Sequence, residues 1–166
     1  MNTIPLDKNK HDRKRFDCAV EPLNNYLKLM AQQHATKDNT RTFILEDPLH
    51  PEFIMGYYTL TMTALNLNAL PLKLQKKHLN AQAAGLIARL AVDKRYAKQG
   101  YGEWLLIDAL HKLLAASDTV AFPIIMVDAK QGIAKFYEKM GFSAFLDEPN
   151  KLFMTLTDVR HSLGNP

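Results

Sequence analysis

The sequence has little of what disulfide-bonded, metal-clustered or membrane-spanning proteins need. Its 166 residues include one cysteine, Cys18, so neither an internal disulfide nor a cysteine-based zinc cluster can form. The six histidines have no His-Glu-x-x-His spacing, and we expect no metal. The sequence has no run of about eighteen apolar residues, and its first residues have no apolar segment typical of a signal peptide. These absences favour a cytoplasmic protein without a membrane span.

The composition suits one globular domain. Hydrophobic residues make up 47% and charged residues 23% of the chain, a balance typical of soluble proteins with a buried core. The formal net charge of +4 is compatible with an anionic ligand or nucleic acid, but many proteins that bind neither share it. We find no repeat and no linker, and we expect a single domain over residues 1–166.

The spacing of apolar residues predicts alternating helices and strands. Residues 64–84 are expected to form a long loop with room for a short helix. The order predicts an α/β chain with a mixed sheet. The predicted elements are a helix from Pro22 to His34, a hairpin of strands 41–46 and 53–62, a strand at 86–92, a helix at 103–116, a strand at 121–127, a helix at 131–140 capped by Gly141, and two strands within 143–157 split at 147–150.

The segment with the clearest chemical meaning joins a strand, a glycine-bearing turn and a helix. Arg89-Leu90-Ala91-Val92-Asp93 leads to Gly100-Tyr101-Gly102 and then to the helix. The first turn of a helix has free N–H groups and positive potential, and glycines let a pyrophosphate approach the backbone. Taken alone, the glycine pair is better explained as a tight turn. It is neither a Walker loop nor a Gly-x-Gly-x-x-Gly dinucleotide motif, because no Gly-Lys-Ser/Thr follows and residue 105 is leucine.

A second segment, Phe136-Tyr137-Glu138-Lys139-Met140-Gly141-Phe142, follows the next predicted strand. With the first segment, it resembles the GNAT superfamily of acetyltransferases over about residues 16–156. In that family the central strand ends at a Gln/Arg-x-x-Gly-x-Gly/Ala turn that holds the pyrophosphate of coenzyme A, and a later helix carries a tyrosine before a Gly-Phe pair. Tyr137 matches that tyrosine, whereas Ala97 stands where the family has Gln or Arg. We expect this departure to remove one side-chain contact and to leave the backbone donors at 98–102.

A narrower resemblance rests on several fragments that occur in one order. They are similar to the GNAT toxins of bacterial toxin–antitoxin pairs, members of which acetylate the α-amine of aminoacyl-tRNA and block translation. The fragments are Phe16-Asp17-Cys18 with Leu23-Asn24-Asn25-Tyr26-Leu27, Gly56-Tyr57-Tyr58-Thr59-Leu60, Arg89-Leu90-Ala91-Val92-Asp93, Val127-Asp128-Ala129-Lys130 and Phe136-Tyr137.

The resemblance implies an architecture and a set of partners. The fold expected is a single GNAT-type domain over residues 1–166, with a mixed, mostly antiparallel sheet, a central splayed strand pair and flanking helices. The implied co-substrate is acetyl-CoA, with no metal. The implied partners are aminoacyl-tRNA, a ribbon-helix-helix antitoxin and a second copy of the chain in a homodimer.

The resemblance also assigns roles to residues. Tyr137 is the expected general acid, because a phenol with a pKa of about 10 is protonated at neutral pH; a packed aromatic is the alternative. Val92 is the expected backbone donor to the thioester carbonyl. An α-amine, with a pKa of roughly 7.7–8.0, needs no strong base, which favours it over a lysine acceptor. The residues expected to bind coenzyme A are Leu90, Ala91, Val92, Arg95, Ala97, Lys98, Gln99, Gly100, Tyr101, Gly102 and Phe136.

Basic residues supply candidate contacts to the tRNA. Lys37, Arg41 and Arg89 are candidate contacts to its phosphates, with Arg13, Lys14 and Arg15 as further candidates. For each residue taken singly, solvated surface charge is the better explanation; the hypothesis is that some of these patches bind the tRNA. Two other functions stay open. One is a GNAT enzyme that acetylates a small amine or a protein N-terminus. The other is a binding protein that keeps the fold without catalysis, which only Ala97 favours.

Overall fold

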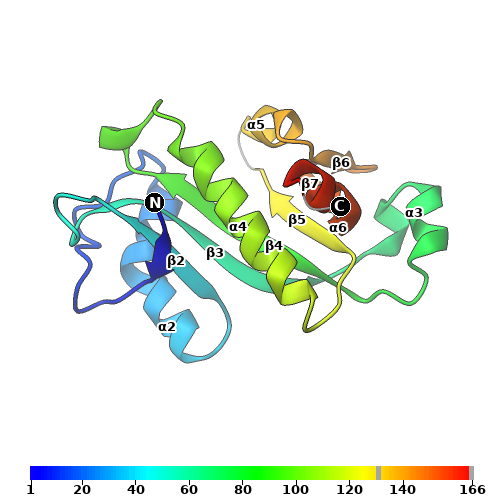
Figure 1. The fold of residues 1–166 in the computed structure, drawn as a ribbon, viewed down its shortest axis with the longest axis horizontal. Coiled ribbons are helices and arrows are strands. Elements are labelled where there is room, and N and C mark those ends of the chain that lie inside the picture. Colours follow the sequence, from blue (N-terminus) through cyan, green and yellow to red (C-terminus); the bar gives the residue numbers. More distant parts are fainter. Residues whose placement is uncertain (130–131, 165–166) are drawn as a thin grey trace. The chain divides into compact units, whose positions relative to one another are not determined.

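A computed structural model describes residues 1–129 and 132–164 (Figure 1). Lys130, quoted in the toxin resemblance, and Gln131, where a helix was predicted to begin, lie outside the described residues. The chain divides into two compact units, and each is described by itself. The first unit comprises Met1–Thr61 and Ala88–Ala109, and the second comprises Met62–Ile87 and Leu110–Pro166.

The described residues contain seven strands in the order β1-β2-β3-β4-β5-β7-β6. The pairs β1–β2, β2–β3, β5–β7 and β6–β7 are antiparallel, and β4–β5 is parallel. This arrangement confirms the predicted α/β fold with a mixed, mostly antiparallel sheet. The strands are β1 (Thr3–Pro5), β2 (Arg41–Glu46), β3 (Ile54–Ala64), β4 (Ala83–Val92), β5 (Ile124–Asp128), β6 (Ser143–Phe145) and β7 (Glu148–Thr155).

Helical segments separate most of the strands along the chain. Residues 21–36 form one helical stretch with a π-helical turn in its middle, and Pro22 occupies its first turn as predicted. The helical elements are α1 (Glu21–Asn25), η1 (Tyr26–Met30), α2 (Ala31–Thr36), η2 (Leu67–Ala69), α3 (Leu72–Lys77), η3 (Lys94–Tyr96), α4 (Tyr101–Ser117), α5 (Ala134–Lys139) and α6 (Leu156–Ser162). None of the described helices is long and apolar enough to cross a membrane.

In the first unit, α2 packs on β2 (Figure 1). The core of this unit draws residues from the helical stretch and from the strands. Tyr57 is fully buried, and its ring meets Phe16 edge-on at 5.5 Å between centroids. Burying such rings removes large apolar areas from water, which stabilises the unit. The core residues are Phe16, Tyr26, Leu27, Ala31, Ile44, Ile54, Tyr57 and Ala91.

In the second unit, α5 and α6 both pack on β7. The parallel register joins Gly85–Ile87 of β4 to Ile125–Val127 of β5. Beyond Ile87, β4 continues to Val92. A separate core contains Leu65, Leu70, Ala84, Ile124, Phe145 and Phe153.

Several boundaries differ from the sequence prediction for local reasons. Strand β5 begins at Ile124, after Pro123 rather than before it, because proline has no N–H for the ladder. Strand β7 already begins at Glu148, so the turn between the last two strands lies earlier than predicted. The final helix α6 was not predicted; Thr155 caps it by accepting the Asp158 N–H at 3.1 Å. Gly141 does cap α5, with φ +102°.

The segment after β4 is anchored by a buried carboxylate, Asp93. The residue is 0% exposed, and its oxygens accept the Arg95 N–H at 2.8 Å, the Arg95 guanidinium at 2.5 Å and the Asp17 N–H at 3.0 Å. Its own N–H donates to Met55 O at 2.9 Å. Asp93 therefore ties β3, the 15–18 segment and η3 to the end of β4.

We expect Asp93→Asn to destabilise the protein, because an amide NH2 would face the donors of Arg95 and Asp17. The free energy of unfolding should fall by about 2–3 kcal/mol at pH 7. Burial alone would raise the pKa of Asp93, but the hydrogen bonds from Arg95 and Asp17 outweigh it and lower the pKa. The stabilisation is therefore complete above the unfolded pKa of about 3.9 and is lost as the pH falls through the lower folded value.

Denaturant unfolding of the parent and the variant between pH 3 and 7 measures this difference. The gap between the two should be constant from pH 7 to about pH 5 and shrink below about pH 4. A gap that is absent at pH 7, or that widens on acidification, would contradict the anchoring role.

Candidate active site

Strand β4, which carries the predicted hydrogen-bond donor Val92, ends where β3 comes close to it. The β2–β3 register shifts between Leu45 and Glu46, which leaves Met55 in a bulge next to Gly56. A Cβ at Gly56 would lie 2.9 Å from Ala91 O and 2.7 Å from a side-chain carbon of α4. Glycine is therefore required here if the end of β4 is to keep its position. That end carries Val92, the predicted donor to the thioester carbonyl, which is half-buried.

The predicted pyrophosphate turn exposes backbone donors. Lys98 has φ +61° and Gly100 has φ +85°, so left-handed residues alternate just before α4. Among the described residues, no backbone acceptor binds the N–H groups of Lys98, Gln99 or Gly100. Tyr101 and Gly102 form the first turn of α4. Left-handed backbone turns and free helix N-termini attract anions, so this segment suits a pyrophosphate.

The side chains of the turn contribute unequally. The guanidinium of Arg95 is bound to Asp93 and to Arg15 O at 2.6 Å, so it is already engaged within the protein. Lys98 is exposed and has no ion pair among the described residues. Ala97 is exposed with φ −67° and ψ 157°, a conformation open to any residue.

Tyr96 fixes the turn from the other side. Its hydroxyl donates to Asp47 Oδ2 at 2.6 Å, which ties η3 to the loop between β2 and β3. Burial and this hydrogen bond raise the pKa of Tyr96 to about 12. The phenol stays neutral over the physiological range, so this tie persists there. Asp93 and Tyr96 together hold the turn before any ligand is present.

The residues predicted to contact tRNA differ in how free they are. The Arg89 guanidinium lies 3.5 Å from the centre of the Tyr26 ring and has no carboxylate partner among the described residues. Arg41 pairs with Asp38 at 2.6 Å and donates to a carbonyl of α2 at 2.9 Å, which closes the end of that helix. Lys37 is exposed at the same helix end. Arg89 and Lys37 are thus more available to a ligand than Arg41.

The ring on which Arg89 rests is held through its hydroxyl. The Tyr26 hydroxyl lies 3.2 Å from His34 Nδ1 and 3.0 Å from Thr40 Oγ1. Its ring also meets the His34 ring edge-on at 5.4 Å between centroids. These contacts fix the ring plane, and a fixed aromatic face orients the cation above it.

The basic segment before the first helix is only partly free. The Arg13 guanidinium donates to Lys28 O at 3.3 Å, and the Arg15 guanidinium lies 3.8 Å from the centre of the Phe53 ring. Lys14 is exposed and has no ion pair among the described residues. Of these three further candidates, Lys14 has the most freedom to meet a phosphate.

Tyr137, the predicted acid, belongs to the second unit. It lies on α5 and is 3% exposed, and its ring meets Phe136 and Phe142 edge-on at 5.1 and 5.6 Å between centroids. No described residue forms a hydrogen bond with its hydroxyl. Burial, and then Asp128, raise the pKa of Tyr137 to about 12, so the phenol is protonated at neutral pH.

The predicted residues thus form two sets. Arg89 and the residues at 90–102 lie together in the first unit, and Phe136 and Tyr137 lie together in the second. Sequence reasoning missed Asp93 and Gly56 as supports of the donor strand. The signal for Asp93 was its place at the end of an apolar strand, where a buried carboxylate needs partners. No group of three or more potential metal ligands occurs among the described residues.

Comparison with known proteins agrees with the family resemblance seen in the sequence. Residues 39–144 match the acetyltransferase (GNAT) domain family. The chain is 25% identical to a probable toxin TacT of Sinorhizobium fredii, over 96% of this chain and 93% of that protein. It is 24% identical to a tRNA-acetylating toxin of Mycobacterium tuberculosis, over 93% of this chain and 92% of that protein.

Solved structures share the fold over nearly the whole chain. AtaT in complex with acetyl-methionyl-tRNAfMet has a TM-score of 0.87 and 26% identity, and covers 98% of each chain. AtaTR bound with acetyl-CoA has a TM-score of 0.83 and 25% identity, over 98% of this chain and 97% of that one. AtaT bound to the C-terminus of the antitoxin AtaR, at 23% identity and a TM-score of 0.82 over 98% and 97%, is alike in fold. Because the matched family spans more than half of the chain, the protein belongs to the GNAT family and is an N-acetyltransferase.

Proposed function

We propose that this protein is a toxin that transfers the acetyl group of acetyl-CoA to the α-amine of an aminoacyl-tRNA and so blocks translation. The observation that carries the proposal is the near-full-length likeness to a tRNA-acetylating toxin and to AtaT with its acetylated tRNA. The anchored turn before α4 supports the donor half of the reaction. It offers backbone N–H groups to a pyrophosphate.

Acetyl-CoA would bind mainly through the backbone. The free N–H groups at 98–100 and the first turn of α4 would hold the pyrophosphate, with Lys98 adding charge. The strand residues at 90–92 would line the acetyl and pantetheine end, and Phe136 would contact the same ligand. Because Asp93 and Arg95 hold the turn, little ordering free energy would be lost on binding.

The chemistry requires a proton at sulfur and a donor at the carbonyl oxygen. The neutral amine attacks the thioester carbon, and the Val92 N–H stabilises the oxyanion. The C–S bond then breaks, sulfur takes the Tyr137 proton, and the phenolate takes a proton from the new ammonium. A phenol with a pKa of about 12 loses its proton uphill to a thiolate whose conjugate acid has a pKa of about 8.5. The proton returned by the ammonium offsets this cost.

The aminoacyl-tRNA would be bound by basic side chains of the first unit. Arg89 and Lys37 would contact tRNA phosphates, and Arg41 would contribute through the end of α2 that it holds. The proposal also includes a ribbon-helix-helix antitoxin, a homodimer and a cytoplasmic location, where charged tRNA is found. Purification of the protein alone and with a co-expressed antitoxin would test the two assemblies.

The direct test is incubation with labelled acetyl-CoA and total charged tRNA. Label should appear on the aminoacyl group, and hydrolysis of the product would name the amino acid. Label on a small amine or a protein N-terminus, with none on tRNA, would replace the proposal by an ordinary GNAT acceptor. Binding of acetyl-CoA without transfer to any acceptor would indicate a binding protein.

Tyr137→Phe should separate acid catalysis from donor binding. Loss of the hydroxyl should lower kcat by roughly 10²- to 10⁴-fold while the ring packing stays. The Kd for acetyl-CoA, measured by calorimetry, should change by less than about twofold, because the phenol acts in the chemical step and does not hold acetyl-CoA. Tyr58→Phe, which removes a hydroxyl that donates to Asp108 Oδ2 at 2.6 Å and has no assigned role in the site, is the matched control. Equal turnover in the parent and Tyr137→Phe would remove the acid role.

Below pH 10, kcat/KM should change with pH in one step only. With an acceptor whose aminoacyl ester is replaced by a stable amide, kcat/KM should rise with pH until the α-amine is neutral, near its pKa of about 7.7–8.0. It should then stay level, because the pKa of Tyr137 is raised to about 12 and the phenol keeps its proton. A fall centred near pH 10 would mean that the acid is an ordinary, unshifted phenol.

Ala97→Gln should tighten donor binding. The variant restores a side-chain donor at the first position of the turn, where the backbone accepts any residue. One hydrogen bond to a charged phosphate should lower the Kd for acetyl-CoA roughly five- to tenfold. Ala97→Leu, of similar size without a donor, is the control and should bind like the parent. Weaker binding by the glutamine variant would argue against pyrophosphate at this turn.

A further inference from the structure

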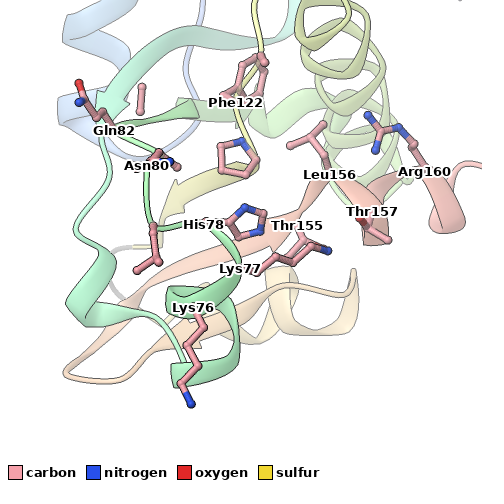
Figure 2. A pocket seen from close by; sticks show the side chains of 15 residues that line it. Lys76, Lys77, His78, Asn80, Gln82, Phe122, Thr155, Leu156, Thr157 and Arg160 are labelled. Atoms are coloured by element: carbon pink, nitrogen blue, oxygen red, sulfur yellow. The ribbon is translucent and has the colours of Figure 1, made fainter.

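A cavity of about 830 Å³ lies in the second unit, and none of the residues predicted for the donor, acid or acceptor lines it. Its walls come from the end of α3 with the loop before β4, from the residues that lead into β5, and from the end of β7 with α6 (Figure 2). The volume is in the range of small-molecule and nucleotide sites. The proposed chemistry leaves this cavity without a role.

The lining of this cavity carries charge of one sign. Lys76, Lys77 and Arg160 line it together with His78, and no Asp or Glu is among the described lining residues. None of these cations has an ion pair among the described residues, whereas several cations of the first unit meet carboxylates at 2.5–2.9 Å. A concave surface with unpaired cations concentrates anions.

Neutral polar groups complete the lining, namely Asn80, Gln82 and Thr157. At pH 7.5 the imidazole of His78 adds a further hydrogen-bonding group rather than a charge. Burial, and then Lys77, lower the pKa of His78, so the ring is neutral there. Such groups can bind the oxygens of an anion that the cations attract.

The backbone around the cavity is fixed by hydrogen bonds. The Ala81 N–H donates to His78 O at 3.0 Å, and the Leu65 N–H donates to Gln82 O at 3.0 Å. On the opposite wall, the N–H of the first residue of α6 donates to Pro123 O at 2.9 Å. These hydrogen bonds hold the backbone on two sides of the cavity.

We propose that this cavity binds backbone phosphates of the RNA substrate, an inference that rests on the proposed function. An ammonium and a guanidinium are the groups that bind phosphate oxygens in proteins. The cavity is far larger than one phosphate ion, and Lys76 is exposed and extends away from the other labelled residues (Figure 2). The positive surface thus continues beyond the cavity, which suits a polyanion rather than a single enclosed anion.

The test compares Lys77→Gln/Arg160→Gln with Lys8→Gln/Lys73→Gln. Both double variants lose two positive charges, and Lys73 lies on α3 without lining the cavity. The Kd for charged tRNA, without acetyl-CoA, is measured by fluorescence anisotropy at several salt concentrations. The cavity variant should bind roughly tenfold more weakly and lose about 1–2 units of the slope of log Kd against log salt. The control variant should stay near the parent.

Donor kinetics distinguish this inference from the proposed function. The KM for acetyl-CoA should be equal in the parent and both variants, because the cavity does not include the donor-binding residues. If the parent binds tRNA and transfers no acetyl group, the proposed function fails. The Kd values of the cavity and control variants for tRNA still test the cavity proposal in that case. Equal tRNA binding by the cavity variant and the parent, or equal losses in both variants, would overturn the cavity proposal. Unchanged tRNA binding with weakened binding of a co-expressed antitoxin would overturn it in favour of a protein partner.

Discussion

The buried carboxylate of Asp93 is the constraint on which the proposed acetyl-CoA site depends. A carboxylate that is 0% exposed is tolerated only when charged or polar donors surround it. Here Arg95 and the Asp17 N–H provide those donors. In return, the carboxylate fixes the end of β4, the short η3 helix and the N-terminal segment. This cluster therefore fixes the position of the turn between η3 and α4.

That constraint determines which groups of the proposed acetyl-CoA site are backbone groups and which are side chains. Arg95 is engaged by Asp93 and a backbone carbonyl, so the nearest arginine supports the turn rather than projecting from it. The left-handed residues Lys98 and Gly100 then present free N–H groups. A site built on backbone donors tolerates alanine at position 97 better than a site built on side chains, because the backbone is unchanged by the substitution. Gly56 also helps to place the end of β4, because it has no side chain to clash with that strand.

Much of the fold followed from the sequence, and the exceptions have physical causes. Strand 41–46 was predicted with its observed bounds, because apolar and β-branched residues end at a turn containing two prolines. The start of β7 at Glu148 and the helix α6 were missed, because a polar strand edge and a seven-residue helix lack a strong periodic signal.

The parts of the site that escaped prediction depend on residues distant in the chain. The engagement of Arg95 was missed because one of its acceptors, Arg15 O, lies 80 residues away along the chain. The cavity was missed for a similar reason. Lys76, Lys77 and His78 form a visible basic run, but Arg160 joins them only in the folded chain.

The central claim is that acetyl-CoA is held by backbone N–H groups of an anchored turn, and amide chemical shifts test it directly. In a ¹⁵N-labelled sample titrated with acetyl-CoA, we predict the largest shift changes at the amides of residues 98–100 and of Val92. The amides that frame the basic cavity of the second unit should stay unchanged. Binding that leaves the amides at 98–100 unmoved and shifts those around Lys77 and Arg160 instead would contradict this claim.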